Sequence, residues 1–242
     1  MNGPLFRELG LGPVWRLRAQ PEPAPQVAAA VAEPAPVVPQ ATMPIGAPDD
    51  RSGVIAGMDW DALRVATAEC RACVLCQQRK QAVLGVGDVA ADWLFVGEGP
   101  GADEDERGEP FVGQAGKLLD AMLAAIDLQR GRGVYIANTV KCRPPGNRTP
   151  EAEETAACWP FLARQIALIQ PKLIIALGKP AAQTLLQTEV KVGAARGQLF
   201  SHQGIPLIVT YHPAYLLRTL PDKAKAWEDL CFMRRTMRGL VG

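Results

Sequence analysis

Four short apolar runs recur along the chain after residue 61, and each is bounded by Gly, Pro, Asn or polar residues. They cover residues 93–96, 134–137, 173–177 and 207–210. Continuous apolar runs of this length are typical of strands that are covered on both faces, as in parallel sheets. The sequence therefore predicts four buried strands.

Amphipathic stretches lie between these runs and after the last of them. They span residues 116–128, 150–169, 180–186 and 223–237, and their apolar positions recur with a helical period. An alternation of strand and helix favours a parallel, doubly wound sheet with helices on both faces. We predict an α/β fold with three layers, α/β/α, around a central four-stranded parallel sheet.

The first sixty residues differ in composition from the rest of the chain. Between residues 21 and 48, 8 of 28 positions are Pro and 8 are Ala, with few charges and no aromatic side chain. Such a segment buries too little apolar surface to offset the chain entropy lost on folding. We predict that residues 1–60 form a disordered extension and that residues 61–242 form the folded domain. The apolar residues within segment 1–18 are either part of this tail or a docking motif for a protein partner.

The charge balance excludes function classes that depend on a strong net charge. The 242 residues include 26 Lys and Arg against 25 Asp and Glu, a net charge of +1. Residues 1–60 hold four Arg against six Asp and Glu, a net −2, which leaves +3 for the remainder. A mildly basic domain permits nucleic-acid binding without indicating it. No apolar run approaches the ~18 residues of a membrane span, so we expect a soluble, cytoplasmic protein, and we expect it to be a monomer.

Glycine-rich or polar segments follow the predicted strands. The first strand runs into residues 97–101, which read GEGPG, and the others run toward Asn138, Gly178 and His212. In parallel sheets of this kind, ligands bind outside the carboxyl ends of the strands. We therefore expect acidic, amide and imidazole side chains, among them Glu98, to lie together at one rim of the sheet.

The glycines after the first strand do not form a nucleotide-binding loop. Neither G-x-G-x-x-G nor G-x-x-x-x-G-K-[ST] occurs in the chain. Pro100 lacks the backbone N–H that a phosphate would require, and the Glu98 carboxylate would repel a pyrophosphate. A nucleotide-binding α/β protein is therefore disfavoured.

Four of the six cysteines have a spacing that suits a metal centre. Cys70 and Cys73 form a C-x-x-C pair, Cys142 follows the second strand, and Cys158 lies on the next predicted helix. Four thiolates can bind one tetrahedral zinc ion or a [4Fe–4S] cluster. The pattern favours the cluster, although the spacing alone leaves zinc open, and Cys76 competes with Cys73 as a ligand.

Several motifs, in their order along the chain, resemble the family 4 (iron–sulfur) uracil-DNA glycosylases. They are Cys70-x-x-Cys73, the GEGPG segment, Glu104-Asp105, Pro110-Phe111-Val112-Gly113, Asn138-x-x-Lys141-Cys142-Arg143-Pro144-Pro145, Cys158 and His212-Pro213-Ala214. The resemblance spans residues 61–238 and does not cover the extension. The related family 5 lacks an acid at the position of Glu98. Relatives that become covalently cross-linked carry a basic, His-containing insertion after the second strand. This chain lacks that insertion, so we expect catalytic turnover rather than cross-linking.

The resemblance implies a monofunctional enzyme of base excision repair. Such an enzyme flips uracil out of DNA and hydrolyses its N-glycosidic bond, which leaves an abasic site. The implied ligands of a structural [4Fe–4S] cluster are Cys70, Cys73, Cys142 and Cys158. The implied contacts to uracil come from Gly99, Phe111, Asn138 and His212. The implied catalytic residues are Glu98, Glu104, Asn147 and His212.

Basic side chains near these motifs are candidates for binding the DNA backbone. Lys141, Arg143 and Arg148 flank the loop after the second strand, and Arg218 follows the His212 motif. Each could neutralise a phosphate. An alternative function is a four-cysteine metal module that binds nucleic acid without catalysis.

Overall fold

The computed structural model of the chain describes residues 50–241. Its helices, in chain order, are α2 (Asp50–Ala56), α3 (Trp60–Glu69), η1 (Val74–Gln77), α4 (Ala102–Arg107), α5 (Gln114–Ala124), η2 (Pro145–Asn147), α6 (Ala152–Ile169), α7 (Lys179–Leu186), α8 (Val192–Ala195), α9 (Pro213–Arg218), η3 (Leu220–Asp222) and α10 (Lys223–Val241). Within this part of the chain, none of the helices combines the length and the apolar character of a membrane span.

One six-stranded sheet forms the centre of the fold, with the strand order β1-β3-β2-β4-β6-β5. The strands are β1 (Val86–Gly87), β2 (Trp93–Gly97), β3 (Val134–Asn138), β4 (Leu173–Leu177), β5 (Leu199–His202) and β6 (Ile205–Thr210). The four inner strands are parallel, which confirms the predicted sheet, and β1 and β5 are antiparallel edge strands. The sequence does not predict the edges, because β1 has two residues and β5 is largely exposed.

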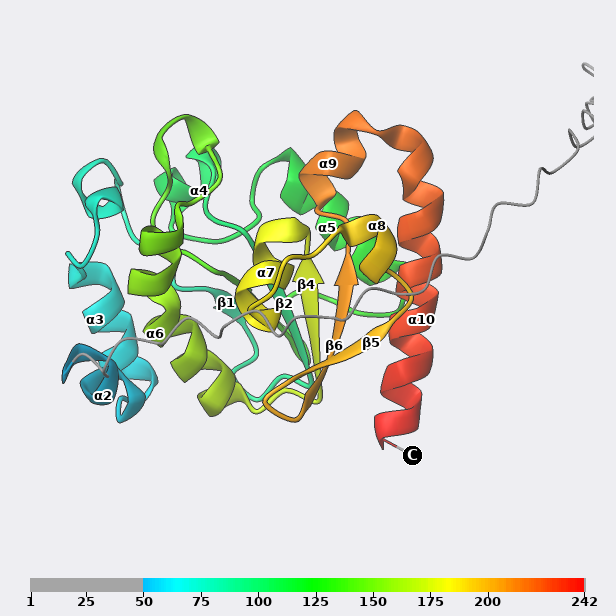
Figure 1. Cartoon of the computed structure of the whole chain (residues 1–242), viewed down its shortest axis with the longest axis horizontal. Helices are drawn as coiled ribbons and strands as arrows, with labels where there is room; N and C mark the ends of the chain where they lie inside the picture. Colours follow the sequence, from blue (N-terminus) through cyan, green and yellow to red (C-terminus); the bar gives the residue numbers. More distant parts are fainter. Residues whose placement is uncertain (1–49, 242) are drawn as a thin grey trace, which may run out of the picture. The chain divides into compact units, whose positions relative to one another are not determined.

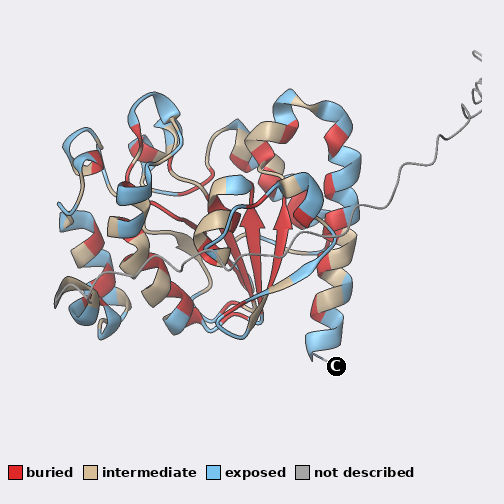
Figure 2. Ribbon diagram, in the orientation of Figure 1, coloured by how far each residue is buried: buried red, intermediate tan, exposed pale blue. Residues whose placement is uncertain are grey.

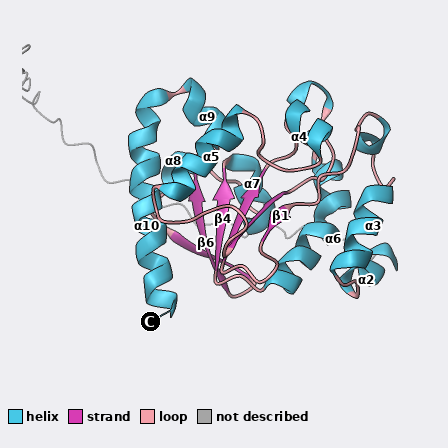
Figure 3. Ribbon diagram, turned by 180° about the vertical axis from the view of Figure 1, so that it is seen from behind, coloured by secondary structure: helices cyan, strands magenta, loops and turns pink. Residues whose placement is uncertain are grey.

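Helices cover both faces of the sheet, so the three-layer prediction is confirmed (Figures 1 and 3). On one face, apolar side chains of β2 and β3 pack with those of α5 and α10. On the other face, the alternate residues of the same strands pack with those of α6 and α7. Figure 2 shows the inner strands as the most buried elements. Every residue of β2, β3 and β4 is buried, which accounts for their apolar character, and the polar exception is Asn138 at the end of β3.

A third apolar cluster joins α2, α3 and η1 to α6. Ile55 of α2 and Leu63 of α3 are buried in it, together with Phe161 of α6. Arg51 reinforces the contact, because its Nη1 donates a hydrogen bond to the Ala157 carbonyl oxygen at 2.8 Å. The folded domain therefore begins by α2, and the predicted boundary at residue 61 is wrong. The rest of the predicted extension, with its docking motif, lies outside the described residues.

A buried ionic network fixes α10 to the end of β6. The Asp229 carboxylate is 1% exposed and accepts hydrogen bonds from Arg196 Nε at 3.0 Å and Thr210 Oγ1 at 2.6 Å. Removing the carboxylate would leave a guanidinium and a hydroxyl group without their buried acceptor. The network therefore supports the strand end from which His212 follows.

We expect Asp229→Ala to lower the free energy of unfolding by about 3 kcal/mol, since it breaks a buried ion pair. The exposed Asp61, which pairs with Arg64, is the matched control, and Asp61→Ala should change the free energy by less than about 0.5 kcal/mol. Urea unfolding followed by circular dichroism measures both values. Equal small effects would contradict the role of the network.

Candidate functional site

The carboxyl ends of the inner strands surround one large cavity. Gly97 at the end of β2 lies opposite Asn138 at the end of β3, and Gly178 after β4 donates its N–H to the Thr210 carbonyl oxygen of β6 at 2.8 Å. The cavity has a volume of about 760 Å³. The predicted site residues that line it are Glu98, Gly99, Glu104, Phe111, Asn138, Asn147, Arg148, His212 and Arg218.

Asn138 presents an unused hydrogen-bond acceptor in this cavity. The residue is 2% exposed, and its Oδ1 is the one buried side-chain N or O atom among the described residues that has no partner. A Cβ atom on Gly97 would lie 2.5 Å from this oxygen and 2.5 Å from Phe111 Cζ. Only glycine at position 97 therefore allows the amide and the aromatic ring to come so close. Buried polar atoms are normally paired, so Oδ1 is available to accept a hydrogen bond from a ligand.

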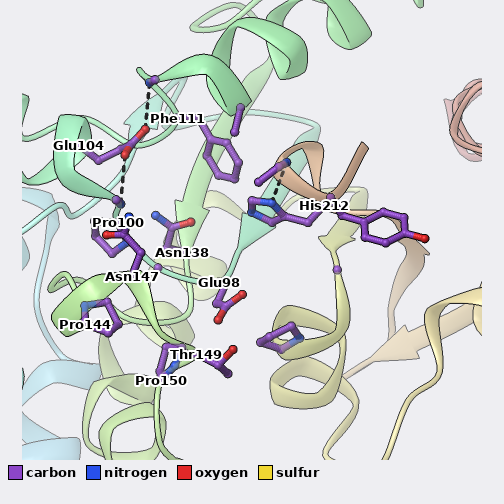
Figure 4. A pocket seen from close by; sticks show the side chains of 18 of the residues that line it. Glu98, Pro100, Glu104, Phe111, Asn138, Pro144, Asn147, Thr149, Pro150 and His212 are labelled. Atoms are coloured by element: carbon purple, nitrogen blue, oxygen red, sulfur yellow. Dashed lines mark hydrogen bonds between the residues drawn. The ribbon is translucent and has the colours of Figure 1, made fainter. Parts of the chain in front are cut away.

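His212 is held as a neutral imidazole with a defined tautomer. It precedes α9, and its Nδ1 accepts a hydrogen bond from the Ala214 N–H at 3.1 Å. Burial and the nearby Arg218 lower the pKa of His212 to about 4. Because Nδ1 is an acceptor, the proton of the neutral ring is on Nε2. The centroid of this ring lies 5.4 Å from that of Phe111, and Figure 4 shows both beside Asn138.

Glu104 lines the cavity, but its carboxylate is already engaged by the backbone. Oε2 accepts a hydrogen bond from Gly101 N at 3.0 Å. Oε1 accepts two more, from Val112 N at 2.9 Å and Gly113 N at 3.0 Å. These contacts tie the loop after β2 to the segment that carries Phe111 (Figure 4). The geometry therefore indicates a positioning residue.

Glu98 and Asn147 face the same cavity from two different loops (Figure 4). Within residues 50–241, no hydrogen bond or ion pair occupies the Glu98 carboxylate, which leaves it available to a water molecule or a cation. Asn147 has a positive φ of 56°, and its Oδ1 accepts a hydrogen bond from Arg143 Nε at 2.8 Å. The Asn147 side-chain nitrogen is a hydrogen-bond donor at the cavity wall.

The structure corrects one of the predicted DNA contacts. Lys141 is 1% exposed, and its Nζ donates to the Asn138 carbonyl oxygen at 2.8 Å and to Gln165 Oε1 at 2.5 Å. Burial also lowers the pKa of Lys141 to about 8. A phosphate cannot reach this ammonium group, so the prediction for Lys141 is wrong. The sequence pattern around it resembles an exposed basic loop, and only the packing shows that the side chain turns inward.

The other three basic candidates differ in their contacts and in their position relative to the cavity. Arg148 directs both terminal nitrogens to the Glu154 carboxylate, at 2.8 and 2.6 Å, and this contact anchors the loop that carries Asn147. Arg218 lines the cavity, whereas Arg143 lies outside its lining. Contacts of these three arginines with DNA stay predictions.

A second, small pocket gathers five cysteines between α3, η1 and α6. Its lining includes Cys70, Cys73, Cys76, Cys142 and Cys158. Burial raises the pKa of the Cys158 thiol to about 12, so this sulfur requires a strong cation to become a thiolate. Among the described residues, no group of three or more His, Cys, Asp and Glu side chains is arranged to hold a single metal ion.

Hydrogen-bond donors surround the sulfur atoms of this pocket. Arg51 Nη2 donates to Cys70 Sγ at 3.3 Å and Arg79 Nη1 donates to Cys142 Sγ at 2.9 Å. The backbone N–H of Lys141 donates to Cys158 Sγ at 3.2 Å. Neither arginine is among the candidates that the sequence pattern predicts. Arg79 lies 63 positions from Cys142, so no local sequence pattern predicts their contact.

The chain is similar in sequence to several known proteins. Residues 84–231 match the family model described as the uracil DNA glycosylase superfamily. The chain is 41% identical to the type-4 uracil-DNA glycosylase of Pyrobaculum aerophilum, over 72% of this chain and 92% of that protein. It is 45% identical to the type-4 enzyme of Thermotoga maritima (65% of this chain, 82% of the relative) and to that of Archaeoglobus fulgidus (61% and 78%). The chain therefore belongs to the uracil-DNA glycosylase superfamily.

Proposed function

We propose that this protein is a monofunctional uracil-DNA glycosylase, which excises uracil from DNA and leaves an abasic site for repair. The observation that carries the proposal is the unpaired, buried Oδ1 of Asn138, in a cavity that also contains the Phe111 ring and a neutral His212. An aromatic face, an amide and a neutral donor suit one planar base.

Asn138 supplies the selectivity between pyrimidines. An amide can accept a hydrogen bond from uracil N3–H through Oδ1 and donate one to uracil O4 through Nδ2. Cytosine presents an acceptor at N3 and a donor at N4, which reverses both requirements. Binding cytosine would leave buried polar groups unpaired, and a site built in this way rejects the wrong partner strongly.

Phe111 stabilises the base after it has left the DNA stack. An enzyme that acts on a base must extrude it from the duplex, which costs a few kcal/mol. Stacking on an aromatic side chain returns about 1–3 kcal/mol for any base. Phe111 therefore contributes to binding, while the choice of base depends on Asn138.

His212 and Glu98 act on the bond that breaks. As the bond between C1′ and N1 lengthens, its electron pair moves to the uracil ring and the sugar becomes cationic. The Nε2–H of His212 donates to O2, where the negative charge of the leaving uracil develops. The Glu98 carboxylate stabilises the sugar cation and orients a water molecule. The water oxygen then bonds to C1′, and the proton that it loses passes to the carboxylate and finally to the departed base.

Other residues support this chemistry without carrying it. We assign Glu104 to the positioning of the Phe111 segment, since both carboxylate oxygens bind backbone N–H groups. Gly99 lets the substrate approach the loop after β2, and Asn147 donates from the loop after β3. We propose Arg143, Arg148 and Arg218 as the side chains that neutralise DNA phosphates. We expect the protein to act as a monomer.

We propose a [4Fe–4S] cluster bound by Cys70, Cys73, Cys142 and Cys158. A cluster spreads its four thiolates over different iron atoms, so it suits cysteines that come from different walls of one pocket. The donors from Arg51 and Arg79 to two of these sulfurs suit a group that carries negative charge. When bound, the cluster cross-links the loop after β3 to α6 and to the segment before η1, and it takes no part in the bond cleavage.

We expect Asn138→Ala to lower the rate of uracil release by about 100-fold, because the substrate loses its buried hydrogen-bond partners. Single-turnover cleavage of a uracil-containing oligonucleotide measures the rate. Gln198→Ala, which removes an exposed amide outside the cavity lining, is the control and should keep the wild-type rate. Full activity of Asn138→Ala would refute the assignment of the pocket. Wild-type protein that binds the oligonucleotide but releases no uracil would instead support the non-catalytic metal module.

The pKa of His212 predicts how the rate depends on pH. A neutral donor that titrates at about 4 keeps the same form between pH 5.5 and 8, so its contribution should not increase as the pH falls through 6.5. The chain has two histidines, and the spectrum of His212→Asn identifies the His212 signal in an NMR titration. A rate that rises on acidification through 6.5, together with a His212 pKa near 6.5, would contradict the neutral-donor mechanism.

We expect the purified protein to contain iron and to absorb visible light broadly. Cys142→Ala should lose the iron and most of the soluble protein, whereas Cys76→Ala and Cys231→Ala should keep both. Cys231 lies on α10 and outside the cysteine pocket, so it controls for the loss of a thiol. Iron and zinc analysis distinguishes the alternatives. Protein that contains zinc without iron would contradict the cluster.

A further inference from the structure

The backbone of Phe111 adopts a conformation that it would not choose alone. Its φ is +55°, in the left-handed region, where the Cβ of an L-residue meets its own backbone. The side chain is also buried, at 6% exposure. A strained residue of this kind persists only where the surrounding structure holds it. The contacts that hold it therefore determine where the aromatic ring lies in the cavity.

Two charged side chains hold the peptide groups on either side of this residue. The Glu104 carboxylate accepts the N–H groups of Val112 and Gly113, which follow Phe111. Arg130 binds the carbonyl oxygens: Nη1 donates to Pro110 O and Nη2 to Phe111 O, both at 2.7 Å. Two N–H groups and two carbonyl oxygens of this short turn are thus fixed by charge-assisted hydrogen bonds.

Arg130 reaches the turn from outside the cavity. It follows α5 in the chain and is absent from the cavity lining, and its side chain is 20% exposed. Asp120 on α5 orients it, because Oδ1 accepts a hydrogen bond from Arg130 Nε at 3.0 Å. The same helix limits the turn directly, since a Cβ on Gly116 would lie 1.7 Å from Phe111 O.

We propose that Arg130 is a positioning residue for uracil recognition, which rests on the proposed function. By binding two successive carbonyl oxygens, Arg130 keeps the Phe111 backbone in its strained conformation. The ring is thereby held where it can stack on the flipped base. The planar guanidinium uses three N–H groups at once, two for the carbonyl oxygens and one for Asp120. A lysine has no such fixed fork and cannot make all three contacts.

The inference predicts weaker binding of the base when the contacts of Arg130 are removed. Arg130→Gln should raise the inhibition constant of free uracil by about tenfold, because a stacking partner that is no longer fixed loses much of its contribution. Arg130→Lys should give an intermediate value. Asp120→Asn, on the surface of α5, keeps the fold and should give a smaller rise of about twofold to threefold. Arg132→Gln, at an exposed position two residues along, should leave the constant unchanged.

A double-mutant cycle with Phe111→Ala tests whether Arg130 acts through the ring. In the Phe111→Ala background, Arg130→Gln should change the inhibition constant of uracil by less than about twofold, since the two residues act as one unit. The same tenfold effect in both backgrounds would overturn the inference. So would wild-type values for Arg130→Gln and Asp120→Asn, even if their melting temperatures fell. Wild-type protein that releases no uracil would overturn the proposed function itself, and this inference with it.

Discussion

The space above Gly97 is the constraint on which the site depends. Here the end of β2 meets the Asn138 amide and the Phe111 ring, and any side chain at position 97 would collide with both. The pairing of Gly97 with Asn138 in the sheet brings the two strand ends together. A buried acceptor beside an aromatic face follows from this contact, and in the function that we propose this acceptor selects a base with a donor at N3.

Hydrogen bonds from neighbouring side chains hold several residues of the cavity wall in place. Glu104 and Arg130 fix the turn of Phe111 through its amide hydrogens and carbonyl oxygens. Lys141 fixes the end of β3, since its ammonium group binds the Asn138 carbonyl oxygen. Its backbone N–H contacts Cys158 Sγ at 3.2 Å. The cysteine pocket and the base pocket therefore share the loop after β3, and a group that cross-links the cysteines also steadies Asn138.

The protonation of the site is set by burial and by helix geometry. The N–H of Ala214 at the start of α9 occupies His212 Nδ1, so the proton of the neutral ring is on Nε2. A neutral donor suits a leaving group that becomes anionic, because the imidazole needs no second proton before the bond breaks. The Glu98 carboxylate lines the same cavity and makes no hydrogen bond or ion pair with the described residues. In the mechanism that we propose, these two groups serve the two halves of the reaction.

The sequence by itself determined the inner strands, the layers and the rim of the site. Buried parallel strands are mainly apolar, so their positions are visible as runs, and the residues at their carboxyl ends must meet at one edge of the sheet. Tertiary packing decided what no local pattern records. It buries the Lys141 side chain and directs the Glu104 carboxylate to backbone N–H groups. It also brings Arg130 into contact with the Phe111 carbonyl oxygen, 19 residues away. Short elements such as α4 and β1 also escaped prediction, because six or two residues are too few to show a period. These features depend on contacts between distant segments, and such contacts exist only once the chain has folded.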